Sequence, residues 1–194
     1  MFEQTGLIQR DGWSYMRGQE GGVSPRTLDV HASRDFEVWT EAQARVFRRD
    51  GSGILSPALY GANTGEQVHI GAALWDRGTV VLAFYGQWHG PKADTDDRRY
   101  LTMDLGLLVT HDALRYDEPI KDFKIVPAKE VCWPDLQPGP RITQGQGTHS
   151  VGDQTVLWYG TWGPGGGDGI RTAVWDRDRL GFAFVPTGMA RPTP

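Results

Sequence analysis

The chain has 194 residues, of which 39% are apolar and 23% charged, and its formal net charge is −4. This length fits one domain or two small ones, and it can bury a core without disulfides. Its single cysteine, Cys132, excludes a disulfide framework and a multi-cysteine metal site. The acidic balance argues against nucleic acid or an anionic membrane as the main partner. No apolar run reaches membrane-span length and residues 1–10 lack a signal-peptide pattern, so we expect a cytoplasmic protein.

Glycine and tryptophan are both abundant, with 26 and 8 residues. Because disordered chains lack aromatic residues, this composition predicts many tight turns between aromatic-rich strands. The exception is the proline-rich tail at residues 186–194, which we expect to be extended and poorly ordered.

A short pattern recurs three times along the chain. A polar residue is followed two positions later by Asp, and four positions after that by an aromatic residue. The copies are Ser33, Asp35 and Trp39; Thr110, Asp112 and Tyr116; and Asp176, Asp178 and Phe182. Because an aspartate in a turn accepts hydrogen bonds from nearby backbone amides, we expect all three aspartates to hold turns.

A second element precedes each copy of this pattern. Gly/Asp turns at 10–12, 76–78 and 151–153 lead into β-rich runs that end at Gly18, Gly86 and Gly160. Such turns between β-rich runs are hairpin signals.

A recurring four-stranded unit suits a β-propeller blade better than a sandwich. The sequence therefore predicts an all-β fold of about three four-stranded antiparallel blades, at 1–60, 61–135 and 136–185. Residues 40–48 are the best helical window, and they fit either one or two helical turns or a segment leading out of a blade.

Two copies of the repeat resemble a known enzyme motif. Residues 32–39 (Ala-Ser-Arg-Asp-Phe-Glu-Val-Trp) and 109–116 (Val-Thr-His-Asp-Ala-Leu-Arg-Tyr) resemble the Ser-x-Asp-Gly-x-x-Trp turn of five-bladed β-propeller glycosidases. Residues 104–109 resemble the strand before that turn. The resemblance is to the families related to levansucrase, invertase and arabinanase. It implies a propeller fold and a carbohydrate as substrate or ligand.

The chain departs from that family pattern in two ways. Three units are too few for five blades. The resemblance also implies a catalytic triad of a first-blade Asp, a second Asp and a Glu, yet no Asn-Asp-Pro or Arg-Asp-Pro segment occurs. The first-blade Asp is therefore either absent or lies in sequence outside this chain, and we expect the chain to correspond to the C-terminal three blades of a longer ancestral propeller.

Propeller blades meet around one channel, which suits a small polar ligand. Aromatic rings cover the C–H faces of sugars, and side-chain amides bridge hydroxyls. The expected substrate-binding residues are Arg17, Gln87, Trp88, His89, Gln144, Gln146, His149 and Trp162, and substrate contact is expected chiefly through Trp88, His89 and Trp162. The alternative is that the tryptophans are core residues between blades, the glutamines of 144–146 a bulged strand edge, and the histidines structural.

Glycoside hydrolysis needs two carboxyl groups, and the catalytic candidates are Asp104, Glu130 and Asp29. Asp104 opens a strand after the charged loop at 94–99. Glu130 lies near Trp133, and burial against that ring would raise its pKa for duty as an acid. The alternative is that these acids are ordinary solvated charges, as most of the 24 acids are.

The sequence leaves two classes of function open. One is a glycoside hydrolase acting on a sugar or oligosaccharide. The other is a carbohydrate-binding or scaffold propeller without catalysis, or an inactive fragment. No phosphate-binding loop, dinucleotide fingerprint or zinc-hydrolase motif occurs, so we expect no cofactor and no metal.

The blade count also bears on assembly. Three blades do not easily close a ring, which leaves apolar faces and strand edges open. We expect a homodimer, or completion by missing N-terminal blades, and not a well-behaved monomer.

Overall fold

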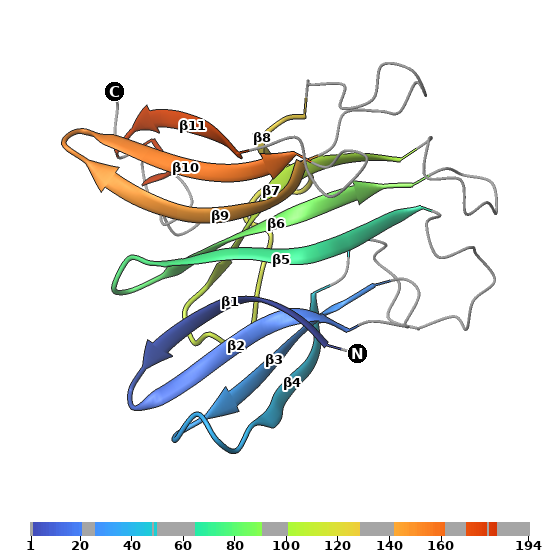
Figure 1. The fold of residues 1–194 in the computed structure, drawn as a ribbon, viewed down its shortest axis with the longest axis vertical. Coiled ribbons are helices and arrows are strands. Elements are labelled where there is room, and N and C mark those ends of the chain that lie inside the picture. The colour runs from blue at the N-terminus through green and yellow to red at the C-terminus, as the bar shows by residue number, and fades with distance from the viewer. Residues whose placement is uncertain are drawn as a thin grey trace.

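Antiparallel β-strands and no α-helix make up the part of the chain that the computed structural model describes, residues 2–20, 26–47, 49, 65–90, 101–128, 142–161, 170–177 and 179–181 (Figure 1). The strands are β1 (Phe2–Arg10), β2 (Trp13–Glu20), β3 (Leu28–Ser33), β4 (Thr40–Phe47), β5 (Glu66–Asp76), β6 (Val81–His89), β7 (Thr102–Thr110), β8 (Lys124–Val126), β9 (Ile142–Val151), β10 (Gln154–Thr161) and β11 (Ile170–Asp176). Within these residues no helix is long and apolar enough to cross a membrane.

The strands form three sheets, each drawn from one stretch of sequence. Sheet A has the order β1-β2-β3-β4, sheet B the order β5-β6-β7-β8, and sheet C the order β9-β10-β11. Every neighbouring pair is antiparallel. Sequential antiparallel strands in separate, stacked sheets are the architecture of propeller blades, so the predicted fold class is confirmed.

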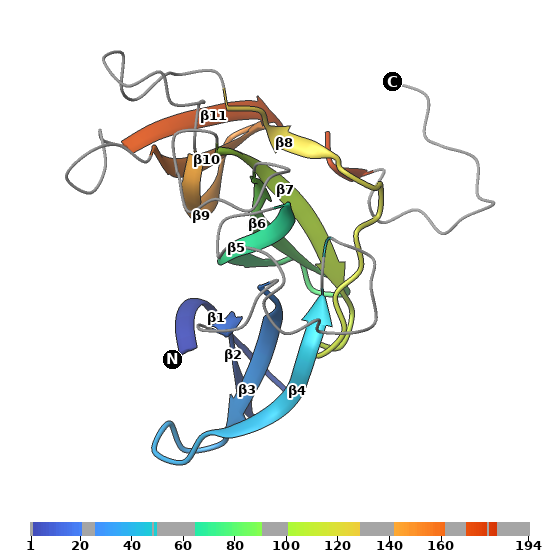
Figure 2. The ribbon, with the colours of Figure 1, turned by 90° about the vertical axis from the view of Figure 1, so that its right-hand side faces the viewer.

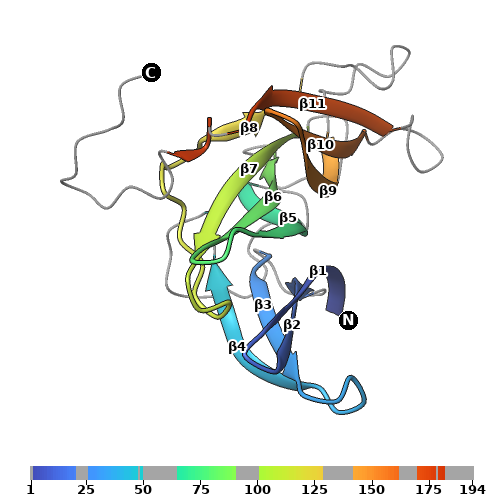
Figure 3. The ribbon, with the colours of Figure 1, turned by 90° about the vertical axis from the view of Figure 1, so that its left-hand side faces the viewer.

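The first strands of the sheets lie together, with β1 beside β5 and β5 beside β9. The later strands of each sheet lead away from this line, as Figures 2 and 3 show from opposite sides. Sheet B is the middle layer, with sheet A on one face and sheet C on the other.

Strand β6 explains how the middle sheet is held. Leu82 and Phe84 pack toward Leu157 of sheet C, whereas Ala83 and Tyr85 join a second cluster with Leu28 and Val30 of sheet A. Because both faces are covered, β6 is an almost continuous apolar run instead of an alternating one.

The two edges of the stack differ. Tight turns at 11–12, 77–80 and 152–153 close the first hairpin of each sheet at one edge, here the turn end. Five longer connections, from β2 to β3, β4 to β5, β6 to β7, β8 to β9 and β10 to β11, leave from the opposite edge, here the loop end, whereas the connections from β3 to β4 and from β7 to β8 leave from the turn end. Binding residues concentrate where long loops gather on a rigid scaffold, so the loop end is the place to look for a site.

The aligned glycines all lie in the second strand of their sheets, Gly18 in β2, Gly86 in β6 and Gly160 in β10. At Gly86 the reason is visible, because a Cβ there would lie 2.7 Å from the backbone oxygen of His69. The glycine allows β5 and β6 to approach closely.

The predicted aspartate turns are confirmed at the two copies within the described residues. Asp35 Oδ1 accepts hydrogen bonds from the amides of Glu37 and Val38, both at 2.9 Å. Asp112 Oδ1 accepts from Leu114 and Arg115, both at 2.8 Å. In each turn the hydroxyl two positions before the aspartate, that of Ser33 and of Thr110, also accepts a hydrogen bond from the amide of the residue after the aspartate. The third copy, at Asp178, lies outside those residues.

Residues 40–47 form β4 and not a helical turn, because they hydrogen-bond to the free edge of β3.

The face of sheet C that points away from sheet B exposes Trp158, Ile170 and Val174. Self-association of the chain stays a prediction. The C-terminal tail lies outside the described residues.

One position in the first aspartate turn yields a stability prediction. Phe36 has a φ of 65°, and Ala113 has the matching value of 63°. Both stand where the glycosidase motif that these turns resemble has glycine, and a left-handed conformation is costly for residues with a Cβ. Phe36→Gly should therefore be about 1 kcal/mol more stable than Phe36→Ala, by denaturant unfolding. Equal stability of the two variants would contradict this account of the turn.

Candidate functional site

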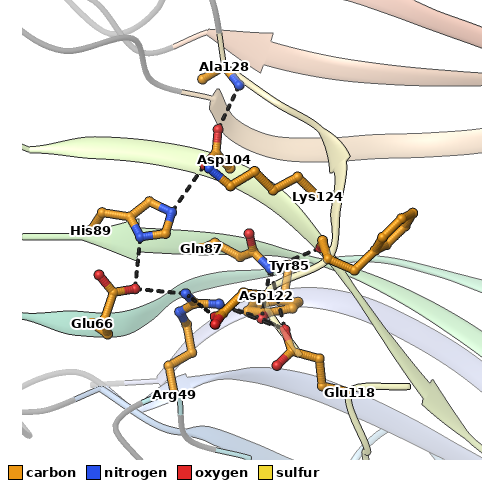
Figure 4. Close-up of polar contacts among 11 residues, drawn as sticks. Arg49, Glu66, Tyr85, Gln87, His89, Asp104, Glu118, Asp122, Lys124 and Ala128 are labelled. Atoms are coloured by element: carbon orange, nitrogen blue, oxygen red, sulfur yellow. Dashed lines mark hydrogen bonds and ion pairs between the residues drawn. The ribbon is translucent and has the colours of Figure 1, made fainter. Parts of the chain in front are cut away.

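A histidine joins two carboxylates at the loop end of sheet B (Figure 4). His89 is the last residue of β6 and pairs directly with Glu66, the first residue of β5. Its Nδ1 lies 2.8 Å from Glu66 Oε2, and its Nε2 lies 3.1 Å from Asp104 Oδ2. A neutral imidazole can donate from only one nitrogen, whereas the imidazolium donates from both. The geometry therefore favours the charged ring.

The electrostatics agree with this assignment. Hydrogen bonds to Asp104 and Glu66 raise the pKa of His89 to about 9, against the opposing effect of burial. Burial would raise the pKa of Asp104, but hydrogen bonds from His89, Lys124 and the Ala128 amide together lower it to about 2. The group is thus an imidazolium between two carboxylates at neutral pH.

The two carboxylates differ in what remains available. Asp104 is 7% exposed in its side chain, and both oxygens are used: Oδ1 accepts the Ala128 amide at 2.7 Å, and Oδ2 faces His89 and Lys124. Glu66 is 47% exposed, and all its contacts with the described residues are made through Oε2. Of the four carboxylate oxygens beside His89, Glu66 Oε1 is therefore the one without a hydrogen bond or ion pair to the described residues.

A second set of contacts lies behind Glu66. Burial alone would raise the pKa of Glu66, but hydrogen bonds from His89 and Arg49 hold it below its ordinary value. The same guanidinium donates to the Tyr85 hydroxyl at 2.8 Å. That hydroxyl in turn donates to Glu118 at 2.6 Å, so the buried tyrosine is fixed at its polar end.

Gln87 completes this buried network. Its Nε2 donates to the carbonyl of Phe123 at 3.0 Å and to the Tyr85 hydroxyl at 3.2 Å. The side chains of Gln87 and Tyr85 cross the neighbouring strand at Gly106, where a Cβ would lie 2.5 Å from Gln87 Nε2 and from Tyr85 Cε1. Gly106 therefore makes room for the network.

Four of the residues singled out from the sequence come together here. Gln87, Trp88 and His89 end β6, and Asp104 pairs directly with Gln87 on β7. Trp88 is fully buried: it stacks on His69 at 5.3 Å, and the Arg26 guanidinium lies over its ring at 4.0 Å. In this structure its ring is a packing surface, so a direct stacking contact with a ligand stays a prediction.

The other candidates are more scattered. Arg17 and Asp29 are buried on β2 and β3 of sheet A. Burial lowers the pKa of Arg17 to about 10, and Tyr116, whose ring centroid lies 5.1 Å from the guanidinium carbon, opposes this shift. His149 is exposed near the turn end, away from Asp104. Gln144 and Gln146 lie in the loop-end half of β9, but the structure does not describe their side chains. Glu130 and Trp162 lie outside the described residues.

Sequence reasoning missed Glu66 and Arg49. Glu66 carries no motif, and only its register opposite His89 reveals it. Arg49 follows β4 of sheet A and reaches Glu66 across the sheet boundary, at 2.7 Å. No local pattern in the sequence signals such a contact.

The arrangement can bind hydroxyl groups and hold charge, and the two carboxylates beside His89 do not supply the acid that glycoside hydrolysis requires. Glu66 and Asp104 have lowered pKa values, so both are ionised at neutral pH and neither serves as a proton donor. Within the described residues no group of three or more His, Cys, Asp or Glu side chains is arranged to hold a metal ion.

The Gly106 packing gives the next prediction. Gly106→Ala should destabilise the chain by about 1–3 kcal/mol, because the new methyl displaces the buried Tyr85 and Gln87 side chains. Gly147→Ala is the matched control, since a Cβ there meets nothing within 4 Å. Denaturant unfolding of both variants measures the difference, and equal stabilities would contradict the packing described.

A pH dependence follows from the raised pKa of His89. Protonation of the folded state is favoured over the unfolded chain, whose pKa is 6.5, so this stabilisation is complete below about pH 6.5 and disappears as the pH rises through 9. The stability advantage of the wild type over His89→Gln should therefore shrink by on the order of 2 kcal/mol between pH 6 and 9.5. Denaturant unfolding at both pH values measures it, and a constant difference would contradict the charged bridge.

No protein-family model matches the chain, and no curated protein matches its sequence. Solved structures do match its fold. The GH32-family β-fructofuranosidase of Bombyx mori superposes with a TM-score of 0.58 and 14% identity, over 92% of this chain and 32% of that enzyme.

Two further structures agree. A GH130-family structure, from work on glycoside hydrolases that target β-1,2-mannosidic linkages in Candida mannan, gives a TM-score of 0.53 and 14% identity, over 89% of this chain and 45% of that one. A glycosyl hydrolase of Bacteroides ovatus gives 0.51 and 12%, over 91% and 46%. The chain thus spans between a third and a half of the length of these proteins. At such identities the likeness establishes the fold, and the chain is built from β-propeller blades of the kind found in these glycoside hydrolases.

Proposed function

We propose that the chain binds a sugar or short oligosaccharide at the loop end of sheet B, as a glycoside hydrolase-like propeller. The observation that carries the proposal is the Glu66 carboxylate: one oxygen is held by His89 and Arg49, while the other is unoccupied by the described residues, and the side chain is 47% exposed. It stands where the long connections of the blades leave the sheets.

A fixed, ionised carboxylate is a suitable acceptor for sugar hydroxyls. Hydrogen bonds to a charged acceptor are stronger than neutral ones, and Glu66 is already oriented by two donors, so little ordering is needed on binding. Asp104 holds His89 in place and is not itself available to a ligand, because its oxygens accept from His89, Lys124 and the Ala128 amide. We assign ligand contact to Glu66 and support to Asp104.

Hydrolysis is the second candidate, favoured by two ionised carboxylates on either side of His89. One of them could act as nucleophile or base, but the reaction also needs a protonated acid at the leaving oxygen. Glu130, on the segment that follows β8, is the acid we propose for that role. The sugar in both cases is expected to be neutral, because the charged groups of the cluster are paired with one another: His89 with Glu66 and Asp104, Lys124 with Asp104, and Arg49 with Glu66, Glu118 and Asp122.

Binding is tested by calorimetric titration with a panel of neutral oligosaccharides. Glu66→Gln should weaken the affinity for any sugar that binds by about tenfold or more, because it removes the charged acceptor. Glu41→Gln, an exposed glutamate of β4 next to the turn end, is the matched control and should leave the affinity unchanged. Equal affinities of the wild type and Glu66→Gln, or the absence of binding across the panel, would overturn the proposal.

A further inference from the structure

Arg49 is the one described residue of the cluster that comes from sheet A's side of the molecule. It follows β4, and its side chain is 2% exposed. The guanidinium reaches across to three acids attached to sheet B: it lies 2.7 Å from Glu66, 3.0 Å from Asp122 and 3.8 Å from Glu118. Figure 4 shows it beneath Glu66, on the opposite side from His89.

The contact with Glu66 is specific to one oxygen. Arg49 Nη2 and His89 Nδ1 both donate to Oε2, at 2.7 and 2.8 Å. With two donors on Oε2, the carboxylate cannot rotate without losing at least one charged hydrogen bond. The pair of donors thereby fixes the orientation of the carboxylate and leaves Oε1 outside both hydrogen bonds.

The other guanidinium nitrogen explains why Arg49 itself cannot move. Arg49 Nη1 donates to the Tyr85 hydroxyl at 2.8 Å, and Tyr85 is packed in the core between sheets A and B. The two nitrogens of a planar guanidinium can donate to the Tyr85 hydroxyl and to Glu66 at the same time in a fixed geometry, whereas an ammonium group has no such fixed fork. The position of Glu66 therefore depends on how sheet A packs against sheet B.

We propose that Arg49 is a positioning residue that acts through Glu66, fixing the carboxylate that receives the ligand and making the site dependent on the contact between sheets A and B. This inference rests on the proposed function for the ligand, but the positioning itself is measurable without one. Arg49 is not assigned any contact with the sugar.

The test uses the ring of His89 as reporter, because it shares Glu66 Oε2 with Arg49. The charged groups that face His89 are Glu66, Asp104 and Arg49, with Lys124 bound to Asp104. The pKa of His89 is measured by NMR titration in wild type, Arg49→Met, Glu66→Gln and the double variant. Arg10→Met, which removes an arginine near Asp76 at the turn end, is the matched control.

If Arg49 acts through Glu66, Arg49→Met changes the His89 pKa by roughly 0.5 or more when Glu66 is present and by less than about 0.2 when it is Gln. Equal shifts in both backgrounds mean direct electrostatics between Arg49 and His89 and overturn the proposal. A lower melting temperature with no pKa change means a purely structural role and also overturns it. Should Arg49→Met fail to fold, Arg49→Lys, which keeps the charge and loses the fork, replaces it in the same cycle with the same criteria.

The ligand arm uses an oligosaccharide that binds the wild type. Arg49→Met should weaken it about as much as Glu66→Gln does, and the double variant should show no additional loss. Additive losses would overturn action through Glu66. If no sugar binds, the proposed function fails, while the His89 titration still decides the role of Arg49.

Discussion

The imidazolium of His89, held between Glu66 and Asp104, is the interaction on which the site depends. It joins the first residue of β5, the last of β6 and the start of β7 by two charged hydrogen bonds. Partly buried charges are costly unless they are paired and hydrogen-bonded. Each member of this row meets that condition: the ring uses both nitrogens, Asp104 uses both oxygens, and Glu66 uses one. The single oxygen left over is the one that we propose receives the ligand.

The rest of the fold serves to keep this row in place. Sheet B is covered on both faces, so β6 cannot shift without disturbing two cores. Gly86 and Gly106 let β6 lie close to β5 and let its side chains cross β7. The tight turns close the first hairpin of each sheet at the turn end, while five longer connections leave from the loop end, where Glu66, His89 and Asp104 lie. Rigid blades with variable loops at one edge are a general way to support a binding site.

The repeated features of the fold could be predicted from the sequence because their causes are local. Asp35 and Asp112 hold turns within a few residues, and Gly18, Gly86 and Gly160 occupy the same strand of successive sheets. The site could be predicted only in part. Counting from the pair of Asp76 and Val81 would set His89 opposite Val68, but two register shifts in β5 bring Glu66 there instead. Arg49 follows a strand of another sheet, and the residue pattern within one strand does not predict a contact between sheets.

We propose that a neutral sugar is bound at the loop end of sheet B. The most direct test of this proposal is an NMR titration of the isotope-labelled chain with the oligosaccharide panel, following the backbone amides. The account predicts saturable chemical-shift changes at Glu66, Gln87 and His89, with Asp11 and Asp153 at the turn end unmoved. Changes centred on the turn end, or no saturable change with any sugar, would contradict it.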